Sequence, residues 1–543
     1  MNWSTFVLLL AAPILVLANQ HHIDEKRKHS HGAAPAEGES NGDAAQVPHI
    51  IMYVIDDLGW NDVSYNGAEF STPNIDFLAN AGIKLNQYYV NRVCSPTRSS
   101  FMAGRYAYNM GQDGNVITNG HPYSLPLNHT TLGDKMKEAG YSTHAIGKWD
   151  LGYYKWAATP TRRGFDTFYG YYNADEDYFT HKCGAMYVNT TTKKRVVMTG
   201  VDFRNNEDPE VDQNGVYSTH VFTEQAEELI MAHNATKEPF FLYMAYQAVH
   251  GPLEAPQKYI DMCAHISRMD RRIFCGMMMA LDEGIGNITK RLKASGMWEN
   301  TLIVFTTDNG GQNHVGGNNW PLRGNKATMW EGGVRGIGFV SGVGVSKPFV
   351  YNGLMHASDW LPTLANVGGA TPATKQVLDG VNVWQELMAN TTSPRSEVLI
   401  TLNPPRTTKP AHPNQRQFLG TAAIRMENWK LILGEPDCAG AAQNETTNGT
   451  MSMCPNGWVH PSGIEVPPPA NSDNVWLFDL DADPLEKNDV HAQHPDVVEK
   501  LRQRIETFNA THINQVEPPV DPASNPALTG GVWSPWIKDD ELA

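Results

Sequence analysis

The stretch HIIMYVIDD, residues 49–57, is an apolar run that ends in two aspartates, Asp56 and Asp57. A short, continuous apolar run of this kind favours a buried strand. Similar runs alternate with amphipathic stretches further along the chain: NIDFLANAG (74–82), YSTHAIG (141–147), VFTEQAEELIMAH (221–233), PFFLYMAY (239–246), MMMALDEGIGNITKRLKASG (277–296) and TLIVFTTD (301–308). This alternation predicts an α/β fold in which a large sheet is flanked by helices.

Polar side chains follow each of these apolar runs. They include Asp56 and Asp57 after the first run, Lys148 after YSTHAIG, His250 after PFFLYMAY, and Asp308 with Asn309 at the end of TLIVFTTD. Ligands of open α/β sheets bind beyond the carboxyl ends of the strands. We therefore expect these side chains to converge on one site.

The sequence pattern changes beyond about residue 395. Pro-rich loops there separate short runs such as TAAIRMENWKLILG (421–434) and NVWLFDLDADP (474–484), which indicates a smaller, mostly antiparallel C-terminal domain. The predicted division is a signal peptide at residues 1–18, a disordered lead-in at 19–46, a large domain at 47–395 and the smaller domain at 396–543. No later stretch is apolar enough for a membrane span.

The net charge and the glycosylation sequons of the chain limit the kinds of partner and the cellular compartment that we expect. The 42 Lys and Arg against 58 Asp and Glu leave a formal charge of −16, which argues against nucleic acid or an anionic membrane as the main partner. The signal peptide predicts the secretory pathway, ending in the lysosome or the extracellular space. Eight N-x-S/T sequons support this route: Asn128, Asn189, Asn234, Asn287, Asn390, Asn444, Asn448 and Asn509.

The six cysteines are too few to build a disulfide scaffold in a chain of 543 residues. Their spacing suggests that Cys263 pairs with Cys275, and Cys438 with Cys454. Cys94 and Cys183 remain. Cys183 is either a free buried thiol or pairs elsewhere, and Cys94 is either a structural cysteine or a chemical one.

Cys94 opens the segment VCSPTRSSFMAGRY, residues 93–106, which contains C-x-P-x-R. With this signature the chain resembles the type I sulfatases. The resemblance implies that a formylglycine-generating enzyme oxidises Cys94 to formylglycine in the endoplasmic reticulum. The hydrated aldehyde then offers two hydroxyls on one carbon: one attacks the sulfur, and the other later helps to expel the sulfate. The alternative is a Cys94 that is merely buried or disulfide-bonded.

The same resemblance implies a calcium site. A lone Asp-Asp or Asp-Asn pair is more often a cap or a turn, but here both pairs stand in sulfatase context. Their oxygens suit a hard divalent cation. The implied ligands are Asp56, Asp57, Asp308 and Asn309, together with residue 94.

The resemblance also assigns roles to the remaining polar side chains. It implies that Arg98 orders the nucleophile and that Lys148 and Lys326 hold the sulfate. His250 would protonate the leaving alcohol, which an imidazole can do near neutral pH. These residues bind and process a sulfated carbohydrate or an aryl sulfate substrate.

The match is closest to arylsulfatase B and its near relatives, through segments such as GGNNWPLRGNKATMWEGGVRGIGFV at residues 316–340. It implies an alkaline-phosphatase-like sandwich, with residues 47–395 as the catalytic domain, and sulfated N-acetylgalactosamine of glycosaminoglycans as substrate. One departure is GKWDLG at residues 147–152, where Asp150 replaces a catalytic histidine of the family. Asp150 therefore also raises an alternative, a catalytically impaired sulfatase-like protein that binds glycans. A phosphohydrolase of the same superfamily is disfavoured by Cys94.

Overall fold

The computed structural model describes residues 47–113, 116–189, 191–235, 237–371, 373–403, 421–436, 456–469, 471, 473–514 and 518–540. The predicted signal peptide and lead-in, and the proposed pair Cys438–Cys454, lie outside these residues. None of the described helices combines the length and the apolar character needed to cross a membrane.

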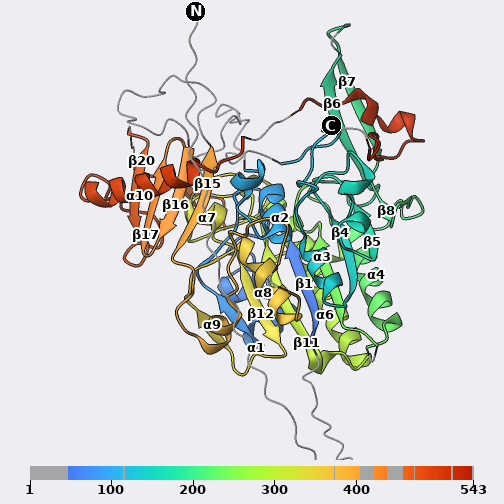
Figure 1. Ribbon diagram of the computed structural model, residues 1–543, viewed down its shortest axis with the longest axis horizontal. Coiled ribbons are helices and arrows are strands. Elements are labelled where there is room, and N and C mark those ends of the chain that lie inside the picture. The colour runs from blue at the N-terminus through green and yellow to red at the C-terminus, as the bar shows by residue number, and fades with distance from the viewer. Residues whose placement is uncertain are drawn as a thin grey trace, which may run out of the picture. The chain divides into compact units, whose positions relative to one another are not determined.

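A ten-stranded mixed sheet forms the centre of the molecule, with strand order β13-β2-β12-β11-β1-β10-β4-β5-β8-β9 (Figure 1). Strands β11, β1, β10, β4 and β5 are mutually parallel, whereas β12 and β8 join them antiparallel. The strands are β1 His49–Ile55, β2 Ile83–Leu85, β4 Ser142–Lys148, β5 Thr167–Tyr171, β8 Arg204–Asn205, β9 Asp208–Pro209, β10 Phe240–Tyr246, β11 Thr301–Thr307, β12 Gly338–Gly342 and β13 Phe349–Tyr351.

Helices cover both faces of this sheet, and alternate side chains of β1 show which helices lie on each. Ile51 and Tyr53 pack into one cluster with α1 Pro73–Ala81, α4 Ser218–Ala232 and α6 Met269–Ala294. Ile50 and Met52 point the other way, toward α2 Cys94–Ala103, α3 Leu132–Glu138 and α8 Trp360–Val367. Burial on both faces explains why β1 is apolar at every position rather than alternating.

A second sheet of four antiparallel strands follows, with β15 Glu397–Asn403, β16 Thr421–Met426, β17 Trp429–Leu433 and β20 Val475–Asp479. Helix α10, Pro495–Asn509, covers one of its faces through Leu501 and Ile505. The other face packs on Tyr89 and Trp330 of the large domain. The predicted α/β class with a smaller antiparallel sheet is thereby confirmed.

The remaining elements are short. They are strands β3 Tyr88–Tyr89, β6 Lys182–Val188, β7 Arg195–Val201, β14 Met355–His356, β18 Trp458–Val459 and β19 Glu465–Val466, and helices α5 Gln257–Met262, α7 Glu331–Val334 and α9 Trp384–Ala389.

The last described segment, residues 518–540, returns to the large sheet domain and lies beside β6 and β7 (Figure 1). Val532 bridges Val201 at the end of β7, and Trp533 packs in the same cluster as Cys183. Cys183 is a free, buried thiol, one of the two possibilities left open by the sequence. The predicted boundary between residues 395 and 396 stays a prediction.

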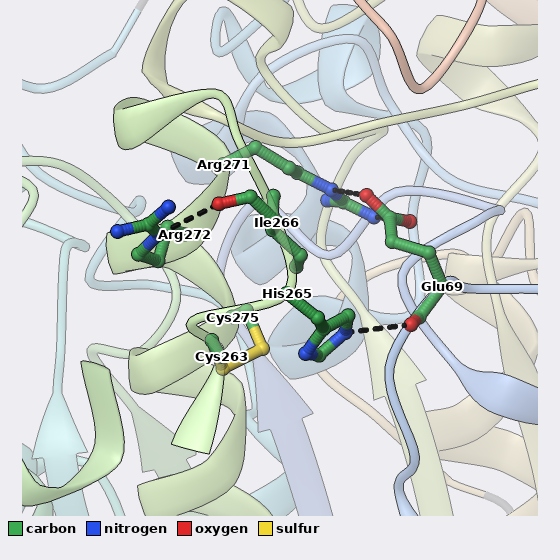
Figure 2. The surroundings of a disulfide bond; sticks show 7 residues. All are labelled: Glu69, Cys263, His265, Ile266, Arg271, Arg272 and Cys275. Carbon is green, nitrogen blue, oxygen red and sulfur yellow. Dashed lines mark hydrogen bonds and ion pairs between the residues drawn. A yellow bond between two sulfur atoms is a disulfide. The ribbon is translucent and has the colours of Figure 1, made fainter. Parts of the chain in front are cut away.

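Cys263 and Cys275 form the predicted disulfide. It ties the end of α5 to the first turns of α6, as Figure 2 shows. Beside it, His265 donates a hydrogen bond to the carbonyl of Glu69, and Arg271 holds the Glu69 carboxylate. This cluster fixes the start of α6 against the loop that follows β1.

Candidate active site

The four predicted metal-binding residues come together at the carboxyl edge of the large sheet. Ile55, the last residue of β1, is in register with Thr307, the last residue of β11. The residues that follow these two strands therefore lie side by side: the backbone N–H of Asp57 donates to Asp308 Oδ1 at 3.2 Å, and Asn309 Nδ2 donates to Asp57 Oδ1 at 2.7 Å.

Cys94 is the first residue of α2, and it faces the same point. Its Sγ lies with carboxylate oxygens of Asp56 and Asp57 and a ring nitrogen of His250 in a group whose atoms are all within 4.8 Å of one another. The side chain is only 1% exposed. Burial raises the pKa of the Cys94 thiol to about 12, although Lys148 and Lys326 act against this shift. The unmodified thiol is thus held neutral and is a poor nucleophile.

Two lysines reach the site from different elements. Lys148, the last residue of β4, places its Nζ 2.7 Å from Asp56 Oδ2, and Lys326 places its Nζ 2.7 Å from Asp57 Oδ1. Gly147 makes the approach of β4 possible, because a Cβ built there would lie 1.9 Å from the carbonyl oxygen of Ala245 on β10. Burial lowers the pKa of each lysine, but the adjacent aspartate and the other acidic groups of the site together raise it above its ordinary value, so both remain cations.

Arg98 lies beneath the site and is fully buried. Its Nε and Nη2 donate to Asp308 Oδ2 at 3.0 and 2.7 Å, and its Nη1 donates to the carbonyl of Lys148 at 3.3 Å. Nη2 is also 3.8 Å from Asp56 Oδ2. Arg98 therefore joins the ends of β1, β4 and β11, and compensates carboxylates that burial would otherwise destabilise.

Asp150, the residue that departs from the family pattern, also belongs to this network. Its Oδ1 accepts a hydrogen bond from Ser95 Oγ at 2.7 Å, and its Oδ2 lies 3.7 Å from Lys148 Nζ. Burial raises the pKa of the Asp150 carboxyl to about 6, against the lowering effect of Lys148 and Arg98. Asp150 is thus close to its point of protonation near neutral pH.

The donor set fits a hard divalent cation. Three buried oxygens of the predicted metal ligands have no hydrogen-bond partner, namely Asp56 Oδ1, Asp57 Oδ2 and Asn309 Oδ1. Buried polar atoms in native proteins are nearly always paired, so unpaired oxygens that converge are suited to bind a cation. Burial and the charge of Asp56 raise the pKa of the Asp308 carboxyl, another sign that negative charge is concentrated here. Carboxylate and amide oxygens are the ligands that Ca²⁺ takes.

His250 sits at the mouth of the site, where its side chain is 18% exposed. Its Nε2 lies 3.8 Å from Asp57 Oδ2, and its Nδ1 bonds to the carbonyl of Gly251 at 2.6 Å. Because a carbonyl only accepts, Nδ1 carries a proton and Nε2 is the atom that faces the site. Tyr178 steadies this segment by donating its hydroxyl to the carbonyl of His250 at 2.8 Å.

Ser95 and Tyr178 were missed as site residues in the sequence. Ser95 was within reach, because it lies inside the C-x-P-x-R signature, next to Cys94. Tyr178 had no usable signal, since it acts on a main-chain carbonyl 72 residues away. Three non-glycine residues of the site, Asp57, Asp150 and Ala327, have positive φ angles of 59°, 53° and 70°. Such backbone strain is concentrated at functional sites.

Comparisons with known proteins agree with this geometry. Residues 48–370 match the family described as Sulfatase. Arylsulfatase J of Mus musculus is 40% identical over 502 residues, covering 91% of this chain and 81% of that protein. Arylsulfatase A of Homo sapiens is 28% identical and covers 84% of this chain and 87% of that protein. The crystal structure of Ps i-CgsB in complex with k-i-k-neocarrahexaose superimposes with a TM-score of 0.67 at 26% identity, covering 89% of this chain and 98% of that chain. The chain therefore belongs to the sulfatase family and is a sulfuric ester hydrolase.

Proposed function

We propose that this hydrolase removes sulfate from sulfated N-acetylgalactosamine in glycosaminoglycans, with a formylglycine made from Cys94 and with Ca²⁺. The observation that carries the proposal is the position of Cys94: it is buried among the unpartnered oxygens of Asp56 and Asp57, with the cations Lys148 and Lys326 beside them. Residue 94 is present as cysteine, so its Sγ marks the point from which the modified side chain would act.

When bound, the cation would polarise sulfate oxygens and favour the ionised form of the nucleophile at residue 94. Asp56, Asp57, Asp308 and Asn309 would hold it. Lys148 and Lys326 would neutralise the sulfate, and their burial strengthens that attraction because little water screens it. Arg98 opposes the protonation of Asp308 and Asp56 and orients both carboxylates.

His250 is suited to protonate the leaving alcohol. Since Nδ1 is committed to the Gly251 carbonyl, a protonated imidazole carries its transferable proton on Nε2, the nitrogen that faces the site. Its partial exposure at the mouth leaves room for the rest of the sugar outside the buried sulfate pocket.

The substrate class rests on relatives and on compartment. The names of the matched proteins refer to aryl sulfates, and one solved relative holds a carrageenan-type oligosaccharide. The six predicted glycosylation sites that fall in the described residues are all at least partly exposed: Asn128, Asn189, Asn234, Asn287, Asn390 and Asn509. This supports a secretory route to the lysosome or the extracellular space, on which a formylglycine-generating enzyme would meet the chain.

The proposal is tested by mass spectrometry of the peptide that spans residue 94, in protein secreted by cells that express the modifying enzyme. We expect the thiol to be replaced by an aldehyde or its hydrate, and the same preparation to release sulfate from a small aryl sulfate. Unmodified cysteine in protein that nevertheless releases sulfate would refute the formylglycine part of the proposal.

Binding of Ca²⁺ should stabilise the fold, because it pairs the oxygens of Asp56, Asp57 and Asn309 that lack partners. At a calcium concentration of 100 times Kd the gain in unfolding free energy is about 2.7 kcal/mol. The measurement is thermal unfolding with chelator and then with added Ca²⁺. Asp57→Asn should reduce the calcium-dependent shift, whereas Asp212→Asn, a change at an exposed aspartate, should keep it. Equal melting temperatures with and without calcium would contradict the site.

Asp150 should make a contribution to the unfolding free energy that falls as pH rises from about 4 to 6. Its pKa is about 6 in the folded protein against the ordinary 3.8, so the folded state binds more protons in that interval. Asp150→Asn removes this contribution. Over the same pH interval, the decrease in unfolding free energy should therefore be about 2–3 kcal/mol smaller for the variant than for the wild type. If the unfolding free energies of the two proteins changed by the same amount over this interval, a raised pKa of Asp150 would be excluded.

The alternative function, glycan binding with impaired turnover, follows from the same residue. An ionised Asp150 about 4 Å from a sulfate would repel it by about 4 kcal/mol at an effective dielectric of 20, although Lys148 offsets part of this. The alternative predicts that Asp150→His raises sulfate release about 100-fold or more, since a positioned acid or base contributes at least about that much. A rate equal to that of the wild type would contradict it.

A further inference from the structure

Arg92 lies two residues before Cys94, at the edge of the active site. Its carbonyl accepts a hydrogen bond from the backbone N–H of Ala327 at 2.7 Å, so its main chain is tied to the loop that carries Lys326. The preceding N–H, of Asn91, donates to Thr97 Oγ1 at 2.8 Å and fixes the entry to α2. Two residues of chain span at most about 7 Å. Arg92 is thus rigidly held close to residue 94.

The guanidinium of Arg92 is buried but lacks the partners that buried arginines need. The side chain is 7% exposed, and its Nε is buried without a hydrogen bond. Other buried arginines of the molecule, Arg98, Arg271 and Arg395, each donate two hydrogen bonds to one carboxylate. Arg92 donates no side-chain hydrogen bond to any residue in the described part of the chain, so the N–H groups of its guanidinium can bind a ligand.

The nearest opposite charge, Asp113, is already engaged. Its Oδ2 accepts from the backbone N–H of Leu402 at 2.5 Å and from Thr401 Oγ1 at 3.2 Å. Burial lowers the pKa of Arg92, and Asp113 only partly opposes this. The positive charge of Arg92 is therefore under-compensated, which is costly unless a further anion arrives.

We propose that Arg92 binds a second anionic group of the substrate, on the sugar next to the one that carries the scissile sulfate. The inference rests on the proposed function and narrows its substrate class to glycans with two neighbouring anions. A guanidinium fork matches both a carboxylate and a sulfate ester by paired, charge-assisted hydrogen bonds. The net charge of −16 opposes the approach of a polyanion, so local cations such as Arg92 have to attract it.

The experiment compares kcat/KM for four substrates. The first is an aryl sulfate with no second anion, and the second is a disaccharide with a sulfated N-acetylgalactosamine beside a uronate. The third is the same disaccharide with that carboxylate reduced, and the fourth is a disulfated disaccharide without a carboxylate. For Arg92→Gln we expect the ratio of kcat/KM for a dianionic substrate to that for the aryl sulfate to fall about 10- to 100-fold. Arg92→Lys, which keeps the charge, should restore part of the ratio. Arg162→Gln, at an arginine whose side chain is 58% exposed, should leave the ratio unchanged.

The two sources of the anion give different patterns. If Arg92 binds a uronate, Arg92→Gln lowers kcat/KM only for the disaccharide with the intact carboxylate. If Arg92 binds a sulfate, the substitution lowers kcat/KM only for the disulfated disaccharide. An equal loss on all four substrates, the result expected if Arg92 only pairs with Asp113, overturns the proposal.

Binding separates this inference from the proposed function. In the Cys94→Ala background, calorimetry with the same disaccharides should show Kd rising about 10- to 100-fold when Arg92 becomes Gln. Should the wild type release no sulfate at all, the proposed function fails, while this titration still decides whether Arg92 holds an anion. An unchanged Kd for both dianionic disaccharides refutes the site.

Discussion

Replacement of Cys94 by alanine is expected to lower sulfate release by about 10⁴-fold or more, the range seen when a nucleophile is removed from an intact catalytic site. The thiol itself is 1% exposed, and burial raises its pKa to about 12, so it has little chemistry of its own to lose. According to the proposed function, what the substitution removes is the position at which the modified side chain would be made. Steady-state release of sulfate from an aryl sulfate measures the effect.

Cys183→Ala is the matched control, because Cys183 is the other free and buried cysteine in the described residues. It lies between Asn173 and the C-terminal segment, where Asn173 Nδ2 is 3.4 Å from its Sγ, and it is not part of the group that Cys94 forms with Asp56, Asp57 and His250. Its loss should change stability but keep turnover. If Cys94→Ala retained more than a few per cent of the activity while folded, another residue would have to be the nucleophile.

Much of the fold followed from local patterns because the central strands are continuous in sequence. Strands β1, β10, β4 and β11 coincide with apolar runs that need no distant partner to be recognised. The return of residues 518–540 to β7 was not predictable in the same way. It depends on contacts such as the bridge from Val201 to Val532 and the packing of Trp533 beside Cys183, and neither of these leaves a periodic signal.

The candidate site was predictable where side chains follow strand ends, since parallel strands deliver those ends to one edge. Asp57 and Asp308 meet for this reason, 251 residues apart in the chain. The partners of Asp150 were not predictable, because its orientation depends on Ser95 and on a left-handed backbone at Asp150. Arg92 could not be singled out at all. In sequence it is one charge among many, and only the missing partner of its Nε makes it informative.

Arg98→Gln should be the substitution with the largest cost in stability, about 3–5 kcal/mol in unfolding free energy, as for other buried pairs that lose one partner. Arg98 donates two hydrogen bonds to Asp308 and lies near Asp56 and Asp150, all fully buried. Glutamine leaves these carboxylates without their shared cation. Burial would then raise the pKa of Asp56, which Lys148, His250 and Arg98 now hold below its ordinary value. Chemical unfolding at pH 7 with chelator present gives the cost.

The comparison with Arg98→Lys separates charge from geometry. Lysine keeps the cation but cannot donate from two nitrogens to Asp308 Oδ2 while a third reaches the carbonyl of Lys148. It should therefore recover part of the stability and little of the activity, since Asp308 and Lys148 lose their fixed positions. Calcium should restore stability to Arg98→Gln more than to the wild type, because the ion supplies positive charge to the same aspartates. If Arg98→Gln were as stable as the wild type without calcium, the carboxylates would have to be protonated in the folded state, and the predicted cation site would lose its charge.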